Sequence, residues 1–385
     1  MRNAVLVSAV RTGVGRAKKG SFINTRVDDL GAIVVKEAVN RVKGLDPAEI
    51  EDVGVGCAIP EAEQGMNVAR IITFLARLPL SVAGTTVNRF CGSSLQTINM
   101  AAQAIMTDCG DVMVAAGVEH MTHVPMGGFS RSPNPRFGSG DFPSAYIPMG
   151  LTAENLAEKY NIGRAAQDEY AAWSHQKAAK AHREGLYKKE IIPVEVEVEG
   201  QKKIMATDEC VRPDTTVEVL STLKAAFKEG GTVTAGNSSP LNDAAAACVL
   251  MSEERAKALG ISPYFRIVAM AVAGCDPAIM GIGPVPAVQK VLKRAKMALK
   301  DIEVIELNEA FAVQNLAVIE ELGLDRSKIN PRGGAVAIGH PLGATGARIM
   351  TTLVHEMIDN NWTIGLETMC IGGGQGIATI IERVR

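Results

Sequence analysis

The sequence predicts an α/β protein built from two similar halves with a segment inserted between them. Short β-rich runs alternate with helical patterns toward both ends of the chain, which is typical of βαβ units and a largely parallel sheet. Residues 125–150 carry five prolines among many glycines and serines, and there the alternation stops. Each half also holds a small-residue helix directly after a turn with a reactive side chain, Cys91 in one and His340 in the other.

The individual elements follow from hydrophobic periodicity. Apolar residues three and four apart predict helices, as in Leu95, Ile98, Ala102 and Ile105, whereas short apolar runs predict buried strands. In chain order we expect a strand over 4–9, helices over 28–42 and 67–76 separated by a strand over 52–57, a helix over 95–106, a strand over 112–118, a helix entered through Pro286, a strand over 304–307, a helix over 344–356 and an apolar run over 363–369.

The insertion contains one strong helical pattern. Residues 164–184 are rich in alanine, with Tyr170, Trp173 and Ala181 as the expected inner face and Gly185 as the stop. His175 and His182 are expected on the exposed side of this helix. We therefore divide the chain into a first half over 1–118, completed by 242–262, an inserted loop domain over 119–241, and a second half over 263–385.

Composition excludes several classes of protein. The chain has 385 residues, of which 47% are apolar and 21% charged, so it is neither a disordered tail nor a coiled coil. Its net charge of −2 and its 4% aromatic residues argue against a nucleic-acid partner. Seven cysteines, odd in number and never spaced Cys-x-x-Cys, fit neither a disulfide framework nor a zinc knuckle. With no apolar stretch near the ~20 residues that span a bilayer, we expect a cytoplasmic protein without integral membrane association.

Cys91 is the first candidate for chemistry. It stands in Asn88-Arg89-Phe90-Cys91-Gly92-Ser93-Ser94, where a helix is expected to begin. The N–H groups of a helix N-terminus lower the pKa of a thiol and increase the thiolate fraction. The alternative is a small buried side chain, which is the commonest fate of a free cysteine.

Three further residues complete the set of candidates. His340 lies among five glycines within residues 333–346, which suits a base held on a tight turn, or else a turn histidine that caps the next helix. Cys370 is followed, after Ile371, by three glycines that begin with Gly372, and it is interpreted as a proton donor or as a core residue at the end of a strand. Asn308 sits between a strand and a helix, where asparagine is usually an N-cap.

Other motifs are missing. The chain has no Gly-x-x-x-x-Gly-Lys-Ser/Thr loop, no complete dinucleotide fingerprint and no Gly-x-Ser-x-Gly elbow, which argues against nucleotide-binding and serine-hydrolase functions. Glu119, His120 and His123 suggest a metal, but no further ligands stand near them in the sequence. We therefore expect no metal and no permanently bound cofactor.

Taken together, four motifs in this order resemble the thiolase family: 88–95, 308–311, 333–346 and 370–376. Similar segments occur across nearly the whole chain, at 11–12, 117–121, 149–154, 234–239 and 283–287. The resemblance implies the thiolase fold, in which two duplicated βαβαβαββ halves form a five-layer αβαβα arrangement with a loop domain over the active site. It also implies a homodimer or homotetramer.

The same resemblance implies a role for each candidate. Cys91 would be the acylated nucleophile, His340 the base that activates it, and Cys370 the acid and base at the α-carbon of the acetyl unit. Asn308 would hold a water that forms one oxyanion hole with His340, and the N–H groups of Cys91 and Gly372 would form the other. Coenzyme A would be a co-substrate bound by the following residues: Met149, Arg212, Phe227, Ala235, Ser239, Ala310 and Phe311.

The implied reaction is thiolytic cleavage of a 3-ketoacyl-CoA by coenzyme A, giving acetyl-CoA and a shortened acyl-CoA, as in fatty acid β-oxidation. Ser94 and Pro148 depart from acetoacetyl-specific relatives and favour medium or long acyl chains, while Val219 replaces a serine that contacts coenzyme A in some relatives. Three alternatives stay open: an acetyl-CoA C-acetyltransferase working toward synthesis, a catalytically silent acyl-CoA-binding protein, and a thiolase subunit of a complex with a hydratase/dehydrogenase.

Overall fold

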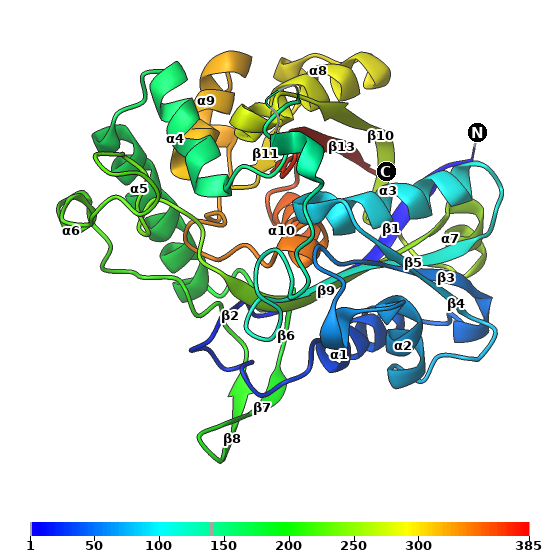
Figure 1. Cartoon of the computed structure of the whole chain (residues 1–385). Helices are drawn as coiled ribbons and strands as arrows, with labels where there is room; N and C mark the ends of the chain where they lie inside the picture. Colours follow the sequence, from blue (N-terminus) through cyan, green and yellow to red (C-terminus); the bar gives the residue numbers. More distant parts are fainter. Residues whose placement is uncertain (1, 139, 141, 385) are drawn as a thin grey trace.

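The computed structural model describes residues 2–138, 140 and 142–384 and confirms the α/β class (Figure 1). Its main sheet follows the order β11-β12-β13-β10-β1-β9-β5-β3-β4. This path joins two smaller sheets, because β1 and β10 pair antiparallel only at Val5–Arg266 and Leu6–Phe265. Each half of the chain thus supplies one sheet, and the two meet at their first strands.

The first half has the chain order βαβαβαββ. The strands β4, β3 and β5 run parallel to one another. The last strand, β9, lies between β5 and β1 and pairs antiparallel with both. The elements are β1 (Ala4–Thr12), α1 (Val27–Asn40), β3 (Ile50–Gly56), α2 (Val68–Leu75), β4 (Ala83–Val87), α3 (Ser93–Met106), β5 (Val112–His120) and β9 (Asn242–Ser252), with the short β2 (Gly15–Arg16) and α7 (Glu253–Ala258) beside them.

The second half repeats this order with one change. Its elements are β10 (Phe265–Gly274), α8 (Pro284–Ala295), β11 (Val304–Leu307), α9 (Ala312–Leu322), α10 (Thr345–Asp359), β12 (Ile364–Ile371) and β13 (Gln375–Arg383). The counterpart of β4 is reduced to a single parallel bridge between Ile305 and Ile329. The predicted duplication is therefore confirmed, and the predicted strand over 304–307 coincides with β11.

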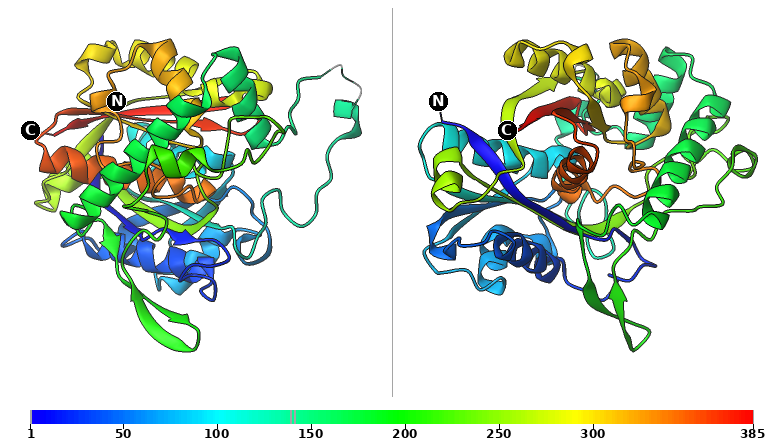
Figure 2. Two further views of the ribbon diagram at one scale, coloured as in Figure 1. Left: turned by 90° about the vertical axis from the view of Figure 1, so that its left-hand side faces the viewer. Right: turned by 180° about the vertical axis from the view of Figure 1, so that it is seen from behind.

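The elements stack in five layers (Figure 2). Helices α1 and α2 cover the outer face of the first sheet, α3 and α10 lie between the two sheets, and α8 and α9 cover the second sheet. Three hydrophobic cores fill the spaces between these layers. The middle layer, α3 with α10, is the one that positions the site described below.

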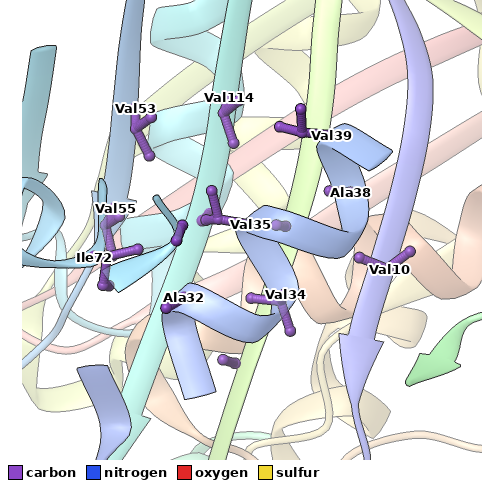
Figure 3. Packing of buried hydrophobic residues seen from close by; sticks show 14 of the residues in the cluster. Val10, Ala32, Val34, Val35, Ala38, Val39, Val53, Val55, Ile72 and Val114 are labelled. Atoms are coloured by element: carbon purple, nitrogen blue, oxygen red, sulfur yellow. The ribbon is translucent and has the colours of Figure 1, made fainter. Parts of the chain in front are cut away.

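Helix α1 shows how sequence pattern produces a layer. Its buried side chains recur every three or four residues, and Val34, Val35, Ala38 and Val39 pack against the strands of the first sheet (Figure 3). Each fully buried valine contributes about 1.5–3 kcal/mol. At Gly31 a Cβ atom would lie 2.5 Å from Ile72 Cδ1, so glycine lets α1 and α2 approach closely.

The segment between β5 and β9 forms a separate group of elements, with α4, α5 and α6 on one side of the molecule (Figure 1). Before α4, described residues of 125–148 form only the 3-10 turn Pro135–Gly138, in line with the expected irregular excursion. The domain boundaries at 118, 241 and 262 stay predictions. The elements are α4 (Met149–Lys159), α5 (Arg164–Arg183), β6 (Ile191–Ile192), β7 (Val194–Val198), β8 (Gln201–Met205) and α6 (Val217–Ser221).

The prediction for the histidines of α5 was wrong. His175 is only 6% exposed, and its Nδ1 accepts a hydrogen bond from the backbone N–H of Arg212. Burial, helped by the charge of Arg212, lowers the pKa of His175 to about 4. His182 is half-buried and bonds Asp208 at 3.2 Å. The prediction failed because the many alanines of α5 allow more than one side of this helix to pack against the rest of the protein.

Candidate active site

Cys91 lies in a 3-10 turn, Phe90–Gly92, between β4 and α3. Phe90 adopts φ 45°, and its N–H donates to Asn88 Oδ1 at 2.8 Å, which fixes the start of the turn. At the end of the turn, a Cβ at Gly92 would lie 2.6 Å from Ile371 Cδ1, so glycine lets the turn pack closely against β12. Cys91 itself is 9% exposed.

His340 stands on the corresponding turn of the second half, before α10. Its backbone N–H donates to Asn242 Oδ1 at 2.8 Å, and its Nδ1 bonds Thr345 Oγ1 at 2.8 Å. Asn308 Nδ2 approaches Nε2 at 3.5 Å. Because the amide nitrogen of Asn308 can only donate, Nε2 of His340 is the acceptor, and the proton of the neutral ring sits on Nδ1. The imidazole is thus held as a base with its lone pair toward Asn308.

The two turns are brought together by the crossing of α3 and α10. A Cβ at Gly346 would lie 2.3 Å from the backbone nitrogen of Leu95, so the helices touch backbone to backbone. Ser94 Oγ accepts the N–H of Ala347 at 2.9 Å and locks the crossing. The glycines that marked residues 333–346 in the sequence are therefore explained by close packing.

Cys370 and Gly372 complete the group from the end of β12. The backbone N–H of Gly372 points at the thiol of Cys91, and Cys370 lies near the thiols of Cys91 and Cys275. Gly373 and Gly374 adopt φ near +80°, which L-residues with side chains rarely adopt. The loop can therefore present its N–H groups inward.

Burial dominates the titration of these groups. It raises the pKa of the Cys91 thiol to about 11, against the opposing effect of the N–H groups of Gly372 and Cys91. It also raises the pKa of Cys370 well above its usual range. Burial, with the charge of Arg348, lowers the pKa of His340 to about 3. The expected lowering of the Cys91 pKa was wrong for this structure, because the helix N-terminus is outweighed by desolvation.

Asn308 does not cap α9, so the ordinary interpretation of this residue was also wrong. The helix begins at Ala312, with Phe311 in the N-cap position and no side-chain cap. Asn308 is 1% exposed, its carbonyl accepts from Asn315 Nδ2 at 3.3 Å, and its Oδ1 has no protein partner. Its side chain is therefore available to the site.

Most of the residues predicted to bind coenzyme A gather next to this group. Phe227 and Phe311 pack edge to face with ring centroids 6.0 Å apart, and a Cβ at Gly150 would strike the ring of Phe227. Met149 Sδ lies within 3.5 Å of a Cβ position at Gly372. The backbone N–H of Ser239 donates to the carbonyl of Ala310 at 3.0 Å. Ala235, four residues before Ser239, is exposed. Arg212 is also exposed, and its backbone N–H bonds His175.

A pocket of about 360 Å³ opens beside the Cys91 turn. It is lined by Asn88, Arg89, Phe90 and Gln375. Arg89 spans it, with hydrogen bonds to Gln375 and Gln96 at 3.1 and 2.9 Å. The Cys91 turn thus borders this pocket through Phe90 and the two residues before it.

Comparison with known proteins places the chain in a family. The family model described as the thiolase N-terminal domain matches residues 4–254, and that for the thiolase C-terminal domain matches residues 261–383. The chain belongs to the thiolase family.

Two relatives and two solved structures are similar over the full length of this thiolase. The 3-ketoacyl-CoA thiolase of Bacillus subtilis is 50% identical, covering 99% of this chain and 100% of its own, and that of Marinobacter nauticus is 52% identical, covering 100% and 99%. The structures of Bacillus anthracis acetyl-CoA acetyltransferase and human mitochondrial 3-ketoacyl-CoA thiolase both give a TM-score of 0.92, at 41% and 38% identity, covering 100% of this chain and 99% of theirs.

Sequence reasoning missed the residues that hold the thiolase site in place. Thr345 and Asn242 fix the ring and backbone of His340, and Glu119 was considered only as a metal ligand. The only signal for Thr345 was its position as a helix-start hydroxyl, which a cap would explain equally well. Asn242 and Glu119 lie about a hundred or more residues from His340 in the sequence and carry no local signal.

The metal prediction rested on an incomplete set of neighbours. In the folded thiolase Glu63 joins His120 and His123, so three ligand-type side chains lie within 4.8 Å. Each imidazole nitrogen already has a partner: Phe22 O and the His123 N–H for His120, and Ile23 O and Glu63 for His123.

Among the described residues, none of the helices is long and apolar enough to cross a bilayer.

Proposed function

We propose that this thiolase is an acyltransferase that cleaves 3-ketoacyl-CoA with coenzyme A in fatty acid β-oxidation. Full-length relatives at about 50% identity carry the name 3-ketoacyl-CoA thiolase. The observation that supports the proposal is the group formed by the Cys91 thiol, the N–H of Gly372 and the thiol of Cys370. The turn that follows His340 contacts the Cys91 turn, and His340 itself approaches Asn308. Coenzyme A is then a co-substrate, and the chemistry calls for no permanent cofactor.

In the first step His340 Nε2 takes the proton of the Cys91 thiol, and the sulfur attacks the 3-keto carbon. The N–H groups of Cys91 and Gly372 stabilise the negative oxygen on that carbon. The bond between C2 and C3 then breaks and leaves its electron pair on an acetyl-CoA enolate. Asn308, with His340 and a water, supports the enolate oxygen, and Cys370 donates its proton to the enolate carbon.

In the second step coenzyme A replaces the enzyme on the acyl group. The Cys370 thiolate takes the proton of the incoming thiol, whose sulfur attacks the carbonyl of acyl-Cys91. The Cys91 sulfur leaves and recovers its proton from His340. This sequence returns each residue to its starting state, and it predicts ping-pong kinetics.

The groups proposed to hold coenzyme A are Met149, Arg212, Phe227, Ala235, Ser239, Ala310 and Phe311. The contact between Phe227 and Phe311 supports an apolar wall near the acyl end, because aromatic rings bury large apolar area. Exposed Arg212 suits a phosphate or adenine contact.

The second candidate function is that of an acetyl-CoA C-acetyltransferase, and the similarity to the Bacillus anthracis enzyme favours it. Ser94, which we took as a sign of longer substrates, is fully buried and bonds Ala347, so it acts in the helix crossing. The preference for medium or long chains then depends on Pro148, the residue before α4.

The deciding experiment is thiolysis of acetoacetyl-CoA and 3-ketohexadecanoyl-CoA in parallel, each with free coenzyme A. The reaction is monitored as the decrease in the absorbance of the ketoacyl-CoA. Turnover of the long substrate is expected. Activity confined to acetoacetyl-CoA would make the protein an acetyltransferase, and no turnover of either would leave a silent acyl-CoA-binding protein.

We further propose a cytoplasmic homodimer or homotetramer. All seven cysteines are free, which suits a reducing compartment. The outermost strand β4 and exposed apolar side chains near it support pairing with a second copy, because such edges and patches are rarely left open. Those side chains are Met66, Ile71, Phe74 and Leu80. Sedimentation gives the state, and co-purification with a hydratase/dehydrogenase tests membership of a larger β-oxidation complex.

A further inference from the structure

Glu119 is a buried carboxylate that the proposed reaction does not use. It stands near the end of β5, is 1% exposed, and accepts hydrogen bonds from three separate segments of the chain. Its Oε2 accepts the backbone N–H groups of Ala58 and Gly343, each at 2.8 Å, and its Oε1 accepts Gln64 Nε2 at 2.6 Å. A carboxylate buried with this many donors is a deliberate feature, since an unpaired one would cost several kcal/mol.

One of these bonds reaches the turn of the base. Gly343 lies three residues after His340, in the 3-10 turn Leu342–Ala344 that connects it to α10. A Cβ at Gly343 would lie 2.7 Å from Ala58 N and 2.8 Å from Glu119 Oε2, so the turn is pressed directly against the carboxylate. Glu119 therefore sets how far the His340 turn stands from the end of β5.

A second bond reaches the turn of the nucleophile through a short relay. The residue whose N–H binds Glu119, Ala58, accepts Asn88 Nδ2 on its carbonyl at 3.0 Å. Asn88 Oδ1 in turn accepts the N–H of Phe90 at 2.8 Å, directly before Cys91. Glu119 thus connects to both turns, one directly and the other through Ala58 and Asn88.

We propose that Glu119 is a positioning residue that fixes the separation of Cys91 and His340 by binding both turns at once. The inference rests on the proposed roles of those two residues. In its ionised form Glu119 accepts all three donors, whereas a protonated carboxyl offers one acceptor fewer, so protonation loosens one of the connections.

The titration of Glu119 falls in a measurable range. Burial raises its pKa to about 6, against the N–H groups of Ala58 and Gly343, which lower it. The titratable groups that face it are the thiols of Cys57, directly after β3, and Cys91. Burial raises the pKa of both thiols, so both are neutral at pH 7 and neither masks a change at Glu119.

The test compares Glu119→Gln with wild type in thiolysis between pH 5 and 8. Glutamine keeps the shape but turns an N–H group toward Gln64 or a backbone donor. We expect kcat to fall at least tenfold at pH 8, KM for coenzyme A to stay within twofold, and the acid decline of kcat near pH 6 to disappear. Glu119→Asp, which keeps the charge, should restore part of kcat and the acid decline.

Glu63→Gln is the matched control, because Glu63 precedes Gln64 but bonds His123 and the N–H of Val27 instead of either turn. It should leave kcat and its pH profile unchanged. An E119Q protein with wild-type kcat, or with an intact acid decline, overturns the proposal.

Asn88→Ala is a second test for the case that E119Q does not fold. Because Asn88 is exposed, we expect its replacement to leave folding intact. We expect this variant to lower kcat severalfold with little change in KM, and wild-type kcat would contradict the relay. Cys91→Ala separates the two levels of inference: an active C91A protein refutes the nucleophile assignment, whereas an inactive one beside a fully active E119Q refutes only the role of Glu119.

Discussion

The Cys91 turn and the His340 turn occupy equivalent places in the two halves, before α3 and α10, yet they are built differently. Phe90 in the first turn is 47% exposed and borders an open pocket. The second turn is buried and bonded on every side, through Asn242, Thr345 and Glu119. The difference teaches that equivalent turns of a duplicated scaffold can differ in exposure and in hydrogen bonding. In the reaction that we propose, the more open turn would receive the acyl group, and the turn held by more hydrogen bonds would only move a proton.

Removing the nucleophile should have the largest effect. Cys91→Ala is expected to lower thiolysis by at least about 10³-fold, because no other group can carry the acyl chain. The measurement is kcat for a 3-ketoacyl-CoA under saturating coenzyme A. Cys109→Ala, at an exposed thiol three residues after the end of α3, is the control and should match wild type. Retention of turnover by C91A would remove the nucleophile from the first turn.

Removing the base should cost less, since coenzyme A and substrate still bind. His340→Gln is expected to reduce kcat by about 10²-fold, the lower end of the usual contribution of a general base. His123→Gln provides the comparison, because His123 bonds Glu63 and the carbonyl of Ile23 away from the site. A loss below tenfold in H340Q would mean that the locked turn serves structure alone.

The two turns should also respond to pH in opposite directions. The pKa of His340 is lowered from 6.5 to about 3, so the unfolded state binds the proton more tightly and stability falls as pH drops below 6.5. The pKa of Cys91 is raised from 9.0 to about 11, so stability falls as pH rises above 9. One pKa unit corresponds to about 1.4 kcal/mol. His340 therefore lowers the free energy of unfolding by about 2 kcal/mol at pH 5, and Cys91 lowers it by about 1 kcal/mol at pH 10.

Urea unfolding at pH 5, 7.5 and 10 measures this contrast. H340Q should lose less stability than wild type at pH 5 and the same at pH 10, and C91A should show the reverse. Equal acid losses in H340Q and wild type would show that folding leaves the pKa of His340 near its ordinary value.

The smallest effect is expected from the group that orients the imidazole. Thr345→Val removes the acceptor of the Nδ1 proton, worth about 0.5–1.5 kcal/mol, and should lower kcat by about threefold to tenfold with unchanged KM. Thr351→Val, equally buried on α10 but bonded to backbone carbonyls, is the control. An effect no larger than that of T351V would assign the orientation of His340 to Asn308.

Much of the fold was predictable because periodicity is a local property. The helices over 164–184 and 95–106 and the strand over 304–307 agree with α5, α3 and β11 to within a few residues. The resemblance also selected Cys91 and Cys370, which the structure brings together, and His340, whose following turn contacts the Cys91 turn. Their catalytic roles stay predictions.

What the sequence could not provide depends on contacts between distant segments. The pKa of Cys91 is decided by desolvation, which exists only after α3, α10 and β12 have packed around it. Asn308 looked like a cap because its neighbours in sequence form a strand and a helix, whereas its partner His340 comes from another turn. The links through Glu119 likewise join segments up to 224 residues apart.

The two ends of the long sheet differ in one more way. Beside β11 the chain places Asn330, whose N–H donates to Ile305 and whose amide bonds the N–H and carbonyl of Leu307, so that edge has its hydrogen-bonding groups occupied. At the β4 end of this sheet the order of the described strands shows no further strand, and Asn67 Nδ2 donates to the carbonyl of Gly84. In the homodimer that we propose, a two-fold contact along β4 would pair this edge with its own copy. Such a contact would be closed, so it would leave this edge unavailable for further strand addition.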